Sequence, residues 1–265
     1  MLKKYLVIGN PIEHSLSPKL HNYWFQNNNI KAVYEKQKLV EEDFENLIVK
    51  IKKEKIHGVN VTVPFKKTII RYLDQLSDEA KNTESVNTIY LDNKKIIGHN
   101  TDINGFKLSI EKQNFDLTNK KVLILGAGGV VPSIIFALNK MNVSEITISN
   151  RTKQKAQNLK NLFKNLNIVD WGTLPEFDMI INATSIGLKK NDYLNIDFSK
   201  IGKNKFFYDV IYNPKQTNFL KIAKNLGHKI ENGKMMFIYQ ASEAFKLWHG
   251  IEPKINNSTM ELLEQ

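Results

Sequence analysis

The sequence predicts an α/β protein with two domains, the first built on a mostly parallel sheet. Three observations predict this class. Strand and helix signals alternate up to about residue 100, a glycine turn follows a short apolar strand near residue 126, and a chain of 265 residues suits one large or two modest domains. We expect a boundary near residue 102, with residues 235–265 packing back on the first domain.

The first domain, residues 1–102, is expected to alternate strands with helices. Strand signals lie at Tyr5–Ile8, Val33–Leu39 and Gly58–Val63. Helical signals separate them at Pro18–Asn27, Glu42–Lys53, Lys66–Leu73 and Asp78–Lys81. A hairpin across Asp92-Asn93 joins Val86–Leu91 to Lys95–Ile97. A helix over Ile103–Lys112 leads into the second domain, and helices over Lys234–Trp248 and Ser258–Leu263 complete the first.

The second domain opens on the strand Val122–Leu125 and the turn Gly126-Ala127-Gly128-Gly129. In a dinucleotide fold, the first glycine permits a tight bend, and the second lets the backbone approach a pyrophosphate at a helix N-terminus. Val131 stands where the third fingerprint glycine would be, so the turn alone is a weak signal. Pro132 in the first helical turn and the apolar helix Ile134–Met141 favour nucleotide binding over a simple turn.

The next strand of this domain, Glu145–Ser149, ends in Asn150-Arg151-Thr152. NAD-preferring folds carry an acidic residue there, which holds the ribose 2′-hydroxyl. A guanidinium and two small hydrogen-bonding groups suit a 2′-phosphate instead. We therefore expect residues 103–234 to form a Rossmann-type domain that binds NADP.

Composition excludes several kinds of chemistry. The chain has no cysteine, which excludes disulfides, thiolate nucleophiles and iron–sulfur ligation and is compatible with a reducing cytoplasm. Its six histidines show no metal-ligand spacing, so no metal is expected. No signal peptide is visible, and no apolar run approaches the ~18 residues of a membrane span.

The net charge of +11 is scattered over the predicted helix faces rather than gathered in a basic block. Such a distribution favours a solvated surface and anionic metabolites over nucleic acid. We expect a cytoplasmic protein with a small-molecule substrate and with neither a membrane nor a nucleic-acid partner.

Three polar clusters interrupt the apolar segments of the first domain. They are His14–Pro18, Asn60–Lys67, and Ser85–Thr88 together with Asn100–Asp102. In the first, Ser15 and Ser17 are two residues apart, so that in extended chain both hydroxyls point the same way and could hold a polyol or a carboxylate. The second follows a strand, and parallel sheets bind ligands at their carboxyl edge.

Each cluster also has a purely structural interpretation. Ser17 before Pro18 is a natural helix N-cap, a lysine such as Lys66 at the start of a helix is usually exposed, and asparagine and aspartate form turns. Several polar clusters that converge on one cleft favour a ligand site over separate turns.

Ordered along the chain, these motifs resemble those of the shikimate dehydrogenase family from end to end. In the first half they are Gly9–Ile12, His14–Pro18, Asn60–Lys66, Val86–Thr88 and Asn100–Asp102. In the second half they are Gly126–Gly129, Asn150–Thr152, Asn182–Gly187, Tyr208–Tyr212, Gln240 and Leu247–Gly250. The resemblance implies reversible, NADPH-dependent reduction of 3-dehydroshikimate to shikimate, a step toward chorismate and the aromatic amino acids.

The resemblance also implies residue roles, with Lys66 and Asp102 as the catalytic pair. The implied substrate residues are Ser15 and Ser17 for the carboxylate, Thr62, Asn87, Asp102 and Gln240 for the ring hydroxyls, and Lys66 and Tyr212 beside them. The implied cofactor residues are Gly126, Ala127, Gly128 and Gly129 at the pyrophosphate, Asn150, Arg151, Thr152 and Lys155 at the adenosine phosphate, and Thr184, Ile211, Tyr212 and Gly233 along the nicotinamide.

Several positions depart from the common pattern of the family. His99 stands where aspartate or glycine is frequent, and Ile103 replaces a frequent glycine, which concerns local loop shape. Lys155 stands where a second arginine often grips the 2′-phosphate, and it keeps the charge but loses the bidentate fork, so we expect softer cofactor selectivity. Lys234-Met235 replaces smaller residues beside the nicotinamide.

The residues leave the proton donor and two alternative functions open. A ketone that accepts hydride needs a proton, which Lys66 can donate either alone or coupled to Asp102. A quinate/shikimate dehydrogenase that uses NAD is the nearest alternative enzyme, and the pair Ser15/Ser17 and Arg151 argue against it. A non-catalytic NADP-binding sensor would not need Lys66 and Asp102 together. The sequence does not choose between a monomer and a homodimer.

Overall fold

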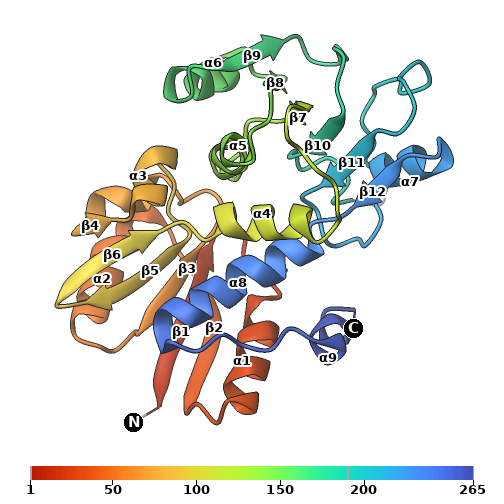
Figure 1. Ribbon diagram of the computed structural model, residues 1–265. Helices are drawn as coiled ribbons and strands as arrows, with labels where there is room; N and C mark the ends of the chain where they lie inside the picture. The colour runs from red at the N-terminus through yellow and green to blue at the C-terminus, as the bar shows by residue number, and fades with distance from the viewer. Residues whose placement is uncertain (1, 190, 265) are drawn as a thin grey trace. The chain divides into compact units, whose positions relative to one another are not determined.

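The computed structural model describes residues 2–189 and 191–264, and the chain divides into two compact units (Figure 1). Unit 1 comprises residues 1–105 and 238–265, and unit 2 comprises residues 106–237. Residues 1, 190 and 265 fall within the predicted domain ranges but lie outside the described residues. Both crossings between the units fall inside helices, α4 (Asp102–Glu111) and α8 (Lys234–His249).

Unit 1 contains a six-stranded mixed sheet in the order β2-β1-β3-β5-β6-β4. Its strands are β1 (Lys3–Gly9), β2 (Ala32–Lys38), β3 (Gly58–Val61), β4 (Gln75–Leu76), β5 (Thr88–Asp92) and β6 (Lys95–His99). Strand β1 is parallel to both β2 and β3, whereas β5 is antiparallel to β3 and β6. The remaining helices of unit 1 are α1 (Ser17–Asn27), η1 (Glu41–Asp43), α2 (Phe44–Lys52), η2 (Thr68–Tyr72), α3 (Asp78–Thr83) and α9 (Asn257–Leu262).

Helices cover both faces of this sheet, which explains why β1, a strand with neighbours on both sides, is buried along most of its length. Leu6 and Ile8 of β1 belong to the same buried cluster as Phe44 and Leu47 of α2. On the other face the ring of Tyr5 contacts aromatic side chains of α1 and α8. These side chains are Trp24, Phe25, Phe245, Trp248 and His249.

Helix α8 approaches the sheet most closely at Gly58, the first residue of β3. A Cβ atom at Gly58 would lie 2.5 Å from the indole of Trp248, so only glycine fits there. The same indole donates a hydrogen bond from Nε1 to the carbonyl oxygen of Ile89, at 3.2 Å. The part of α8 from Ile238 to Trp248 therefore packs into unit 1.

Unit 2 contains six parallel strands in the order β12-β11-β10-β7-β8-β9. They are β7 (Lys121–Leu125), β8 (Glu145–Ser149), β9 (Leu166–Val169), β10 (Met179–Asn182), β11 (Phe206–Asp209) and β12 (Lys229–Glu231), and the helices between them include α5 (Val131–Lys140), α6 (Lys153–Leu162) and α7 (Asn218–Asn225). The order runs outward in both directions from the boundary between β7 and β10, as in a Rossmann fold. The predicted fold class is confirmed.

Two predicted elements of unit 1 differ from the structure, and strand β4 is additional to the prediction. The helix predicted over Lys66–Leu73 is the short 3₁₀ helix η2 (Thr68–Tyr72), in which Ile69 is buried and Ile70 and Tyr72 pack partly buried against the same core cluster. Strand β4 was not predicted, since two residues carry no periodic signal. The hairpin turn lies at Asn93-Lys94, one residue later than predicted, because both residues adopt the positive φ that a tight two-residue turn requires.

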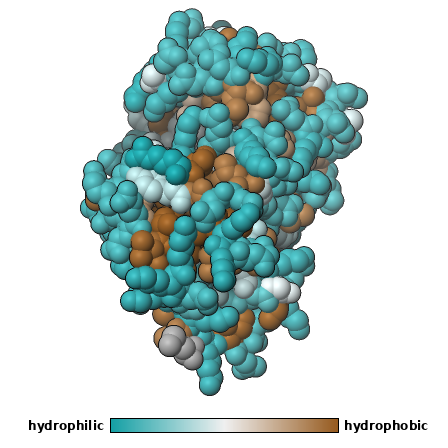
Figure 2. Space-filling model, turned by 90° about the vertical axis from the view of Figure 1, so that its left-hand side faces the viewer, coloured by the Kyte–Doolittle hydropathy of each residue, from teal (hydrophilic) through white to brown (hydrophobic). Residues whose placement is uncertain are grey.

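Within the described residues, no helix has the length and apolar character needed to cross a bilayer. Figure 2 shows that hydrophilic residues cover most of the face in view, with smaller hydrophobic patches between them.

Candidate active site

In unit 1, polar residues follow the carboxyl ends of β1 and β3. Strands β2 and β3 flank β1 on opposite sides, and such a switch in strand order leaves a crevice where open α/β sheets bind ligands. The two strand ends are held close together: the Thr62 N–H donates to the carbonyl oxygen of Ile8 at 2.9 Å, and a Cβ at Gly9 would lie 2.5 Å from the Thr62 methyl group. Ser15 and Ser17 follow β1, and Thr62 and Lys66 follow β3.

The two serine hydroxyls lie side by side, with 3.3 Å between their oxygens. The prediction that Ser17 is the N-cap of α1 is wrong. Leu16 occupies the cap position with helical dihedrals, so the helix begins one residue earlier than Pro18 suggested, and no side chain caps it. The Ser17 N–H instead donates to the hydroxyl of Ser15 at 3.3 Å. Both hydroxyls therefore lie at the N-terminal end of α1, where an anion is favoured.

Lys66 and Asp102 form an ion pair in a nearly buried position, with side chains 12% and 8% exposed. The Asn87 amide donates to the other carboxylate oxygen of Asp102 at 2.9 Å, and the Asp102 N–H donates to the side chain of Asn100 at 3.1 Å. The carboxylate is thus held at one oxygen by Asn87 and pairs at the other with the ammonium group of Lys66, while Asn100 anchors the backbone of Asp102. A lysine so held can deliver a proton to a developing oxyanion.

A buried hydrogen-bond network that sequence reasoning missed extends from the serines to Asp102. The Ser17 hydroxyl contacts the hydroxyl of Tyr34, which donates to Asn60 Oδ1 at 2.6 Å. Asn60 donates to Thr88 Oγ1 at 3.0 Å, and Thr88 donates to Asn87 Oδ1 at 3.0 Å. Burial holds the pKa of Tyr34 well above its usual range, so its hydroxyl keeps the proton that it donates.

No sequence signal marked Tyr34. It is the single aromatic residue of β2, and the residues of β2 that follow it are charged or polar and exposed. Asn60 lay inside a predicted cluster, but its contacts to Tyr34 and Thr88 depend on strand pairing. Such contacts join positions far apart in the chain and leave no local pattern.

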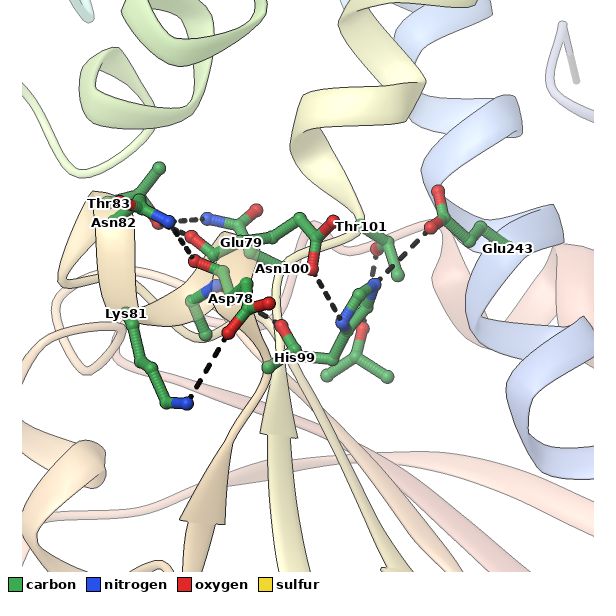
Figure 3. Close-up of polar contacts among 12 residues, drawn as sticks. Asp78, Glu79, Lys81, Asn82, Thr83, His99, Asn100, Thr101 and Glu243 are labelled. Atoms are coloured by element: carbon green, nitrogen blue, oxygen red, sulfur yellow. Dashed lines mark hydrogen bonds and ion pairs between the residues drawn. The ribbon is translucent and has the colours of Figure 1, made fainter.

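His99, which departs from the family's common pattern, lies between two carboxylates (Figure 3). Its Nε2 lies 3.3 Å from Oε1 of Glu243 on α8, and its Nδ1 lies 3.9 Å from Oε2 of Glu79 on α3. The neighbouring Asn100 donates to Thr83 Oγ1 at 3.0 Å. These contacts anchor the segment before Asp102 to two helices. Gln240, the predicted substrate residue on α8, lies one helical turn before Glu243.

In unit 2, the predicted glycine turn lies after β7, beside the end of β10. Gly126 has φ +108°, and a Cβ there would lie 2.8 Å from the carbonyl oxygen of Ala183, so glycine is required. Ala127, Gly128 and Gly129 follow before α5. No side chain caps this helix, so the N-terminal end of α5 suits a pyrophosphate.

The predicted phosphate-binding residues lie at the end of β8 and the start of α6. The side chain of Asn150 donates to the carbonyl oxygen of Thr152 at 2.8 Å, which closes the turn between β8 and α6. Thr152 immediately precedes α6. Arg151 and Lys155 are exposed. Within the part of the chain that the structure describes, no carboxylate forms an ion pair with Arg151, so its guanidinium is available to an anion.

The residues predicted along the nicotinamide lie near the ends of β10, β11 and β12. Thr184 donates to the side chain of Asn182 at 2.7 Å. Gly233 N–H donates to the carbonyl oxygen of Ile211 at 3.2 Å, and a Cβ at Gly233 would lie 2.1 Å from the carbonyl oxygen of Val210. The ring of Tyr212 stacks on Phe237 with 4.6 Å between centroids.

The structure thus gathers the predicted site residues into two groups, each in one unit. Unit 1 holds Ser15, Ser17, Thr62, Lys66, Asn87, Asp102 and Gln240. Unit 2 holds Tyr212 and all of the predicted cofactor residues. Among the described residues, no three histidine or acidic side chains are arranged to hold a metal ion.

Comparisons with known proteins match two family models to the chain. Residues 7–89 match the family model of the shikimate dehydrogenase substrate binding domain, and residues 109–229 match the model of shikimate / quinate 5-dehydrogenase. A relative from Pelagibacter ubique (strain HTCC1062), named shikimate dehydrogenase (NADP(+)), is 60% identical over 264 residues, which span 100% of both chains.

Solved structures give the same result. The crystal structure of shikimate dehydrogenase from Aquifex aeolicus is 35% identical, with a TM-score of 0.89 over 99% of this chain and 98% of that chain. Shikimate 5-dehydrogenase from Thermus thermophilus, in complex with NADP(H) and shikimate, is 31% identical, with a TM-score of 0.88 over 98% of this chain and 97% of that chain. The chain therefore belongs to the shikimate dehydrogenase family.

Proposed function

We propose that this protein catalyses the reversible, NADPH-dependent reduction of 3-dehydroshikimate to shikimate, a step toward chorismate and the aromatic amino acids. The observation that carries the proposal is the nearly buried pair Lys66–Asp102, braced by Asn87, in a chain that is 60% identical to a named shikimate dehydrogenase (NADP(+)). A non-catalytic NADP sensor would have no use for such a pair.

When bound, NADPH supplies a hydride to the carbonyl carbon of the substrate. Lys66 donates a proton to the carbonyl oxygen as negative charge develops there, so that a ketone becomes an alcohol. Asp102 holds the ammonium group in place, and Asn87 fixes the orientation of Asp102. In the reverse direction the same lysine accepts the proton. The contact supports a coupled pair over a lysine that acts alone.

The substrate carboxylate is proposed to bind at Ser15 and Ser17. Two adjacent hydroxyls at the start of α1 favour an anion through hydrogen bonds and through the helix dipole. Thr62, Asn87, Asp102 and Gln240 are proposed to bind the ring hydroxyls, and Tyr212 to lie beside the ring.

The cofactor is proposed to bind unit 2, with its pyrophosphate at Gly126–Gly129 and the N-terminal end of α5. The exposed Arg151 would bind the 2′-phosphate, aided by Asn150, Thr152 and Lys155. Arg151 favours NADP over NAD, because NAD has no phosphate for the guanidinium to grip. Thr184, Ile211 and Gly233 would lie along the nicotinamide.

The test is the loss of NADPH absorbance on addition of 3-dehydroshikimate, with NADH measured in parallel and quinate offered in the reverse direction. We expect turnover with NADPH and a weaker rate with NADH. Faster turnover of quinate with NAD would favour the alternative enzyme, and NADP binding without any turnover would favour a sensor. The cytoplasmic location and the choice between monomer and homodimer stay predictions.

A further inference from the structure

Asp209 is a fully buried carboxylate at the end of β11, and the proposed reaction does not use it. Its Oδ1 accepts hydrogen bonds from the side chain of Asn182 at 3.1 Å and from the backbone N–H of Ile211 at 3.0 Å. Its Oδ2 accepts a hydrogen bond from the hydroxyl of Thr217 at 2.5 Å. Within the described residues it forms no ion pair, so these three neutral donors stabilise its charge.

The first donor, Asn182, shapes the segment that follows β10. Its Oδ1 accepts from the backbone N–H of Thr184 at 3.1 Å and from the Thr184 hydroxyl at 2.7 Å, and its amide also donates to the carbonyl oxygen of Ile186 at 3.1 Å. The Thr184 hydroxyl in turn accepts from the N–H of Ile186 at 3.0 Å. Asp209 orients the Asn182 amide and thereby fixes the turn that carries Thr184.

The other two donors hold the neighbouring segments. Ile211 receives a hydrogen bond from Gly233 through its carbonyl oxygen, so its position sets that of Gly233. Thr217 caps α7, and its methyl group would lie 3.0 Å from a Cβ at Gly187. The three hydrogen bonds of Asp209 therefore connect it, directly or through one neighbour, to Thr184, Ile211 and Gly187. These residues lie on segments that the proposed cofactor site uses.

Burial of the Asp209 carboxylate costs folding free energy, and the need to fill space in the core does not explain why a carboxylate stands there. Desolvation raises the pKa of Asp209 from 3.8 to about 6, and its three hydrogen bonds only partly oppose this rise. An apolar side chain of similar volume often packs as well as a buried charged group. What an apolar side chain cannot do is accept hydrogen bonds from Asn182 on β10, from Ile211 and from Thr217, and so fix their spacing.

We propose that Asp209 is a positioning residue for the nicotinamide half of the cofactor site, acting through Asn182 on Thr184 and directly on Ile211. This inference rests on the proposed function, since it assumes that Thr184 and Ile211 face the nicotinamide. Asp209 itself touches neither the substrate nor the reacting atoms. It sets where the groups beside them lie.

The test compares two ligands by calorimetric titration of the full chain. NADP occupies the whole proposed cofactor site, whereas 2′,5′-ADP occupies only the adenosine and phosphate part. Asp209→Leu should weaken NADP by roughly ten- to a hundredfold, because misplaced contacts are costly, and leave 2′,5′-ADP within about twofold of the wild type. Asp209→Asn, which keeps an acceptor facing Ile211 and Asn182, should restore NADP affinity to within about threefold.

Tyr208→Phe is the matched control, because Tyr208 is the buried neighbour of Asp209 on β11. Its hydroxyl bonds Ser109 at 2.9 Å, on a helix that lies outside the proposed cofactor residues. This variant also loses one buried hydrogen bond, but its ratio of NADP to 2′,5′-ADP affinity should not change. If Asp209→Leu does not fold, Asn182→Ala removes the link from Asp209 to Thr184, together with the Asn182–Ile186 hydrogen bond, and should shift the ratio in the same direction.

The outcomes distinguish the proposed function from the positioning role of Asp209. If wild-type protein binds neither ligand, the proposed function fails. If wild-type protein binds both and the ratio is unchanged in Asp209→Leu, or in Asn182→Ala where that variant replaces it, the positioning role of Asp209 is wrong while the function stands. An equal shift of the affinity ratio in Tyr208→Phe would also overturn the positioning role of Asp209, because loss of any buried hydrogen bond on β11 would then have the same effect.

Discussion

The two units hold their proposed ligands by different means. Unit 1 offers side chains, the nearly buried pair Lys66–Asp102 and two serine hydroxyls, tied together by a buried network of hydrogen bonds. Unit 2 offers mainly backbone, at glycines such as Gly126, together with the exposed cation Arg151. Truncating a side chain should therefore impair chemistry and substrate choice in unit 1, and cofactor choice in unit 2.

The largest expected effect is that of Lys66→Ala in unit 1. Loss of a general acid–base group lowers kcat by roughly 10²–10⁴-fold, and NADP affinity should stay nearly unchanged because Lys66 lies outside unit 2. Steady-state kinetics and NADP titration measure the two effects. Lys67→Ala is the matched control, since Lys67 is exposed and pairs with Glu84 at 2.6 Å. A Lys66 variant that keeps more than half of the wild-type kcat would remove it from the mechanism.

Arg151→Ala should change cofactor choice without touching unit 1. A charge-assisted hydrogen bond contributes about 1.5–3 kcal/mol, so the preference for NADPH over NADH should fall by about one to two powers of ten. The measurement is kcat/KM with each cofactor. Lys153→Ala is the control, because Lys153 is also exposed but pairs with Asp170 at 2.7 Å. Equal weakening of both cofactors would make Arg151 a structural residue.

Acid should destabilise the protein through buried histidines of unit 1. Burial lowers the pKa of His21 from 6.5 to about 3, so the unfolded chain binds a proton there between pH 6.5 and 3 while the folded chain does not. This group's contribution to the free energy of unfolding is therefore present above pH 6.5 and lost as the pH falls. Between pH 7 and pH 5 the loss is about 2 kcal/mol.

The measurement is urea unfolding at both pH values, for the wild type and for His21→Phe. The pH-dependent loss should be smaller in the variant by about 2 kcal/mol. His249, with its pKa lowered to about 4, acts in the same direction, and Asp209, with its pKa raised to about 6, acts in the opposite one. His249 and Asp209 are present in the wild type and in the variant, so their contributions to the pH dependence cancel when the two proteins are compared. An unchanged pH dependence would contradict the assignment to His21.

The smallest expected effect is that of Ser15→Ala on substrate binding. KM for shikimate should rise by about tenfold with a smaller change in kcat, because the carboxylate is remote from the reacting carbon and its binding is largely uniform. An analogue without the carboxylate, measured on both proteins, provides the control. If the variant loses the same factor against both ligands, Ser15 does not read the carboxylate.

The sequence predicted those features that have a local chemical cause. The turn at Gly126 was predictable because its backbone conformation requires glycine, and the Rossmann-type domain was predicted from the strand and helix that flank this turn. The family was predicted from ordered motifs and is confirmed. The start of α1 was wrong by one residue, since Leu16 adopts helical dihedrals that proline and serine preferences do not reveal.

Long-range contacts were not predictable. Tyr34 on β2 and Asn60 on β3 meet across β1, and this depends on the order in which the three strands pair. His99 contacts Glu243, which lies 144 positions further along the sequence. The roles of individual site residues stay predictions, including those of Thr62, Gln240 and Gly233. Their chemistry depends on a bound substrate or cofactor, which the pattern of residue types cannot describe.

The close packing of Trp248 on Gly58 has a consequence for biosynthesis. The ribosome makes residues 1–105 first, then the whole of unit 2, and only afterwards the segment that carries Trp248 and Phe245. At about 5–20 residues per second, the rings of Tyr5 and Phe25 wait on the order of ten seconds for these partners. Unit 2 is continuous and can fold during that interval. The half that starts first is therefore the half that finishes last, and its sheet is open to chaperones or misassociation until then.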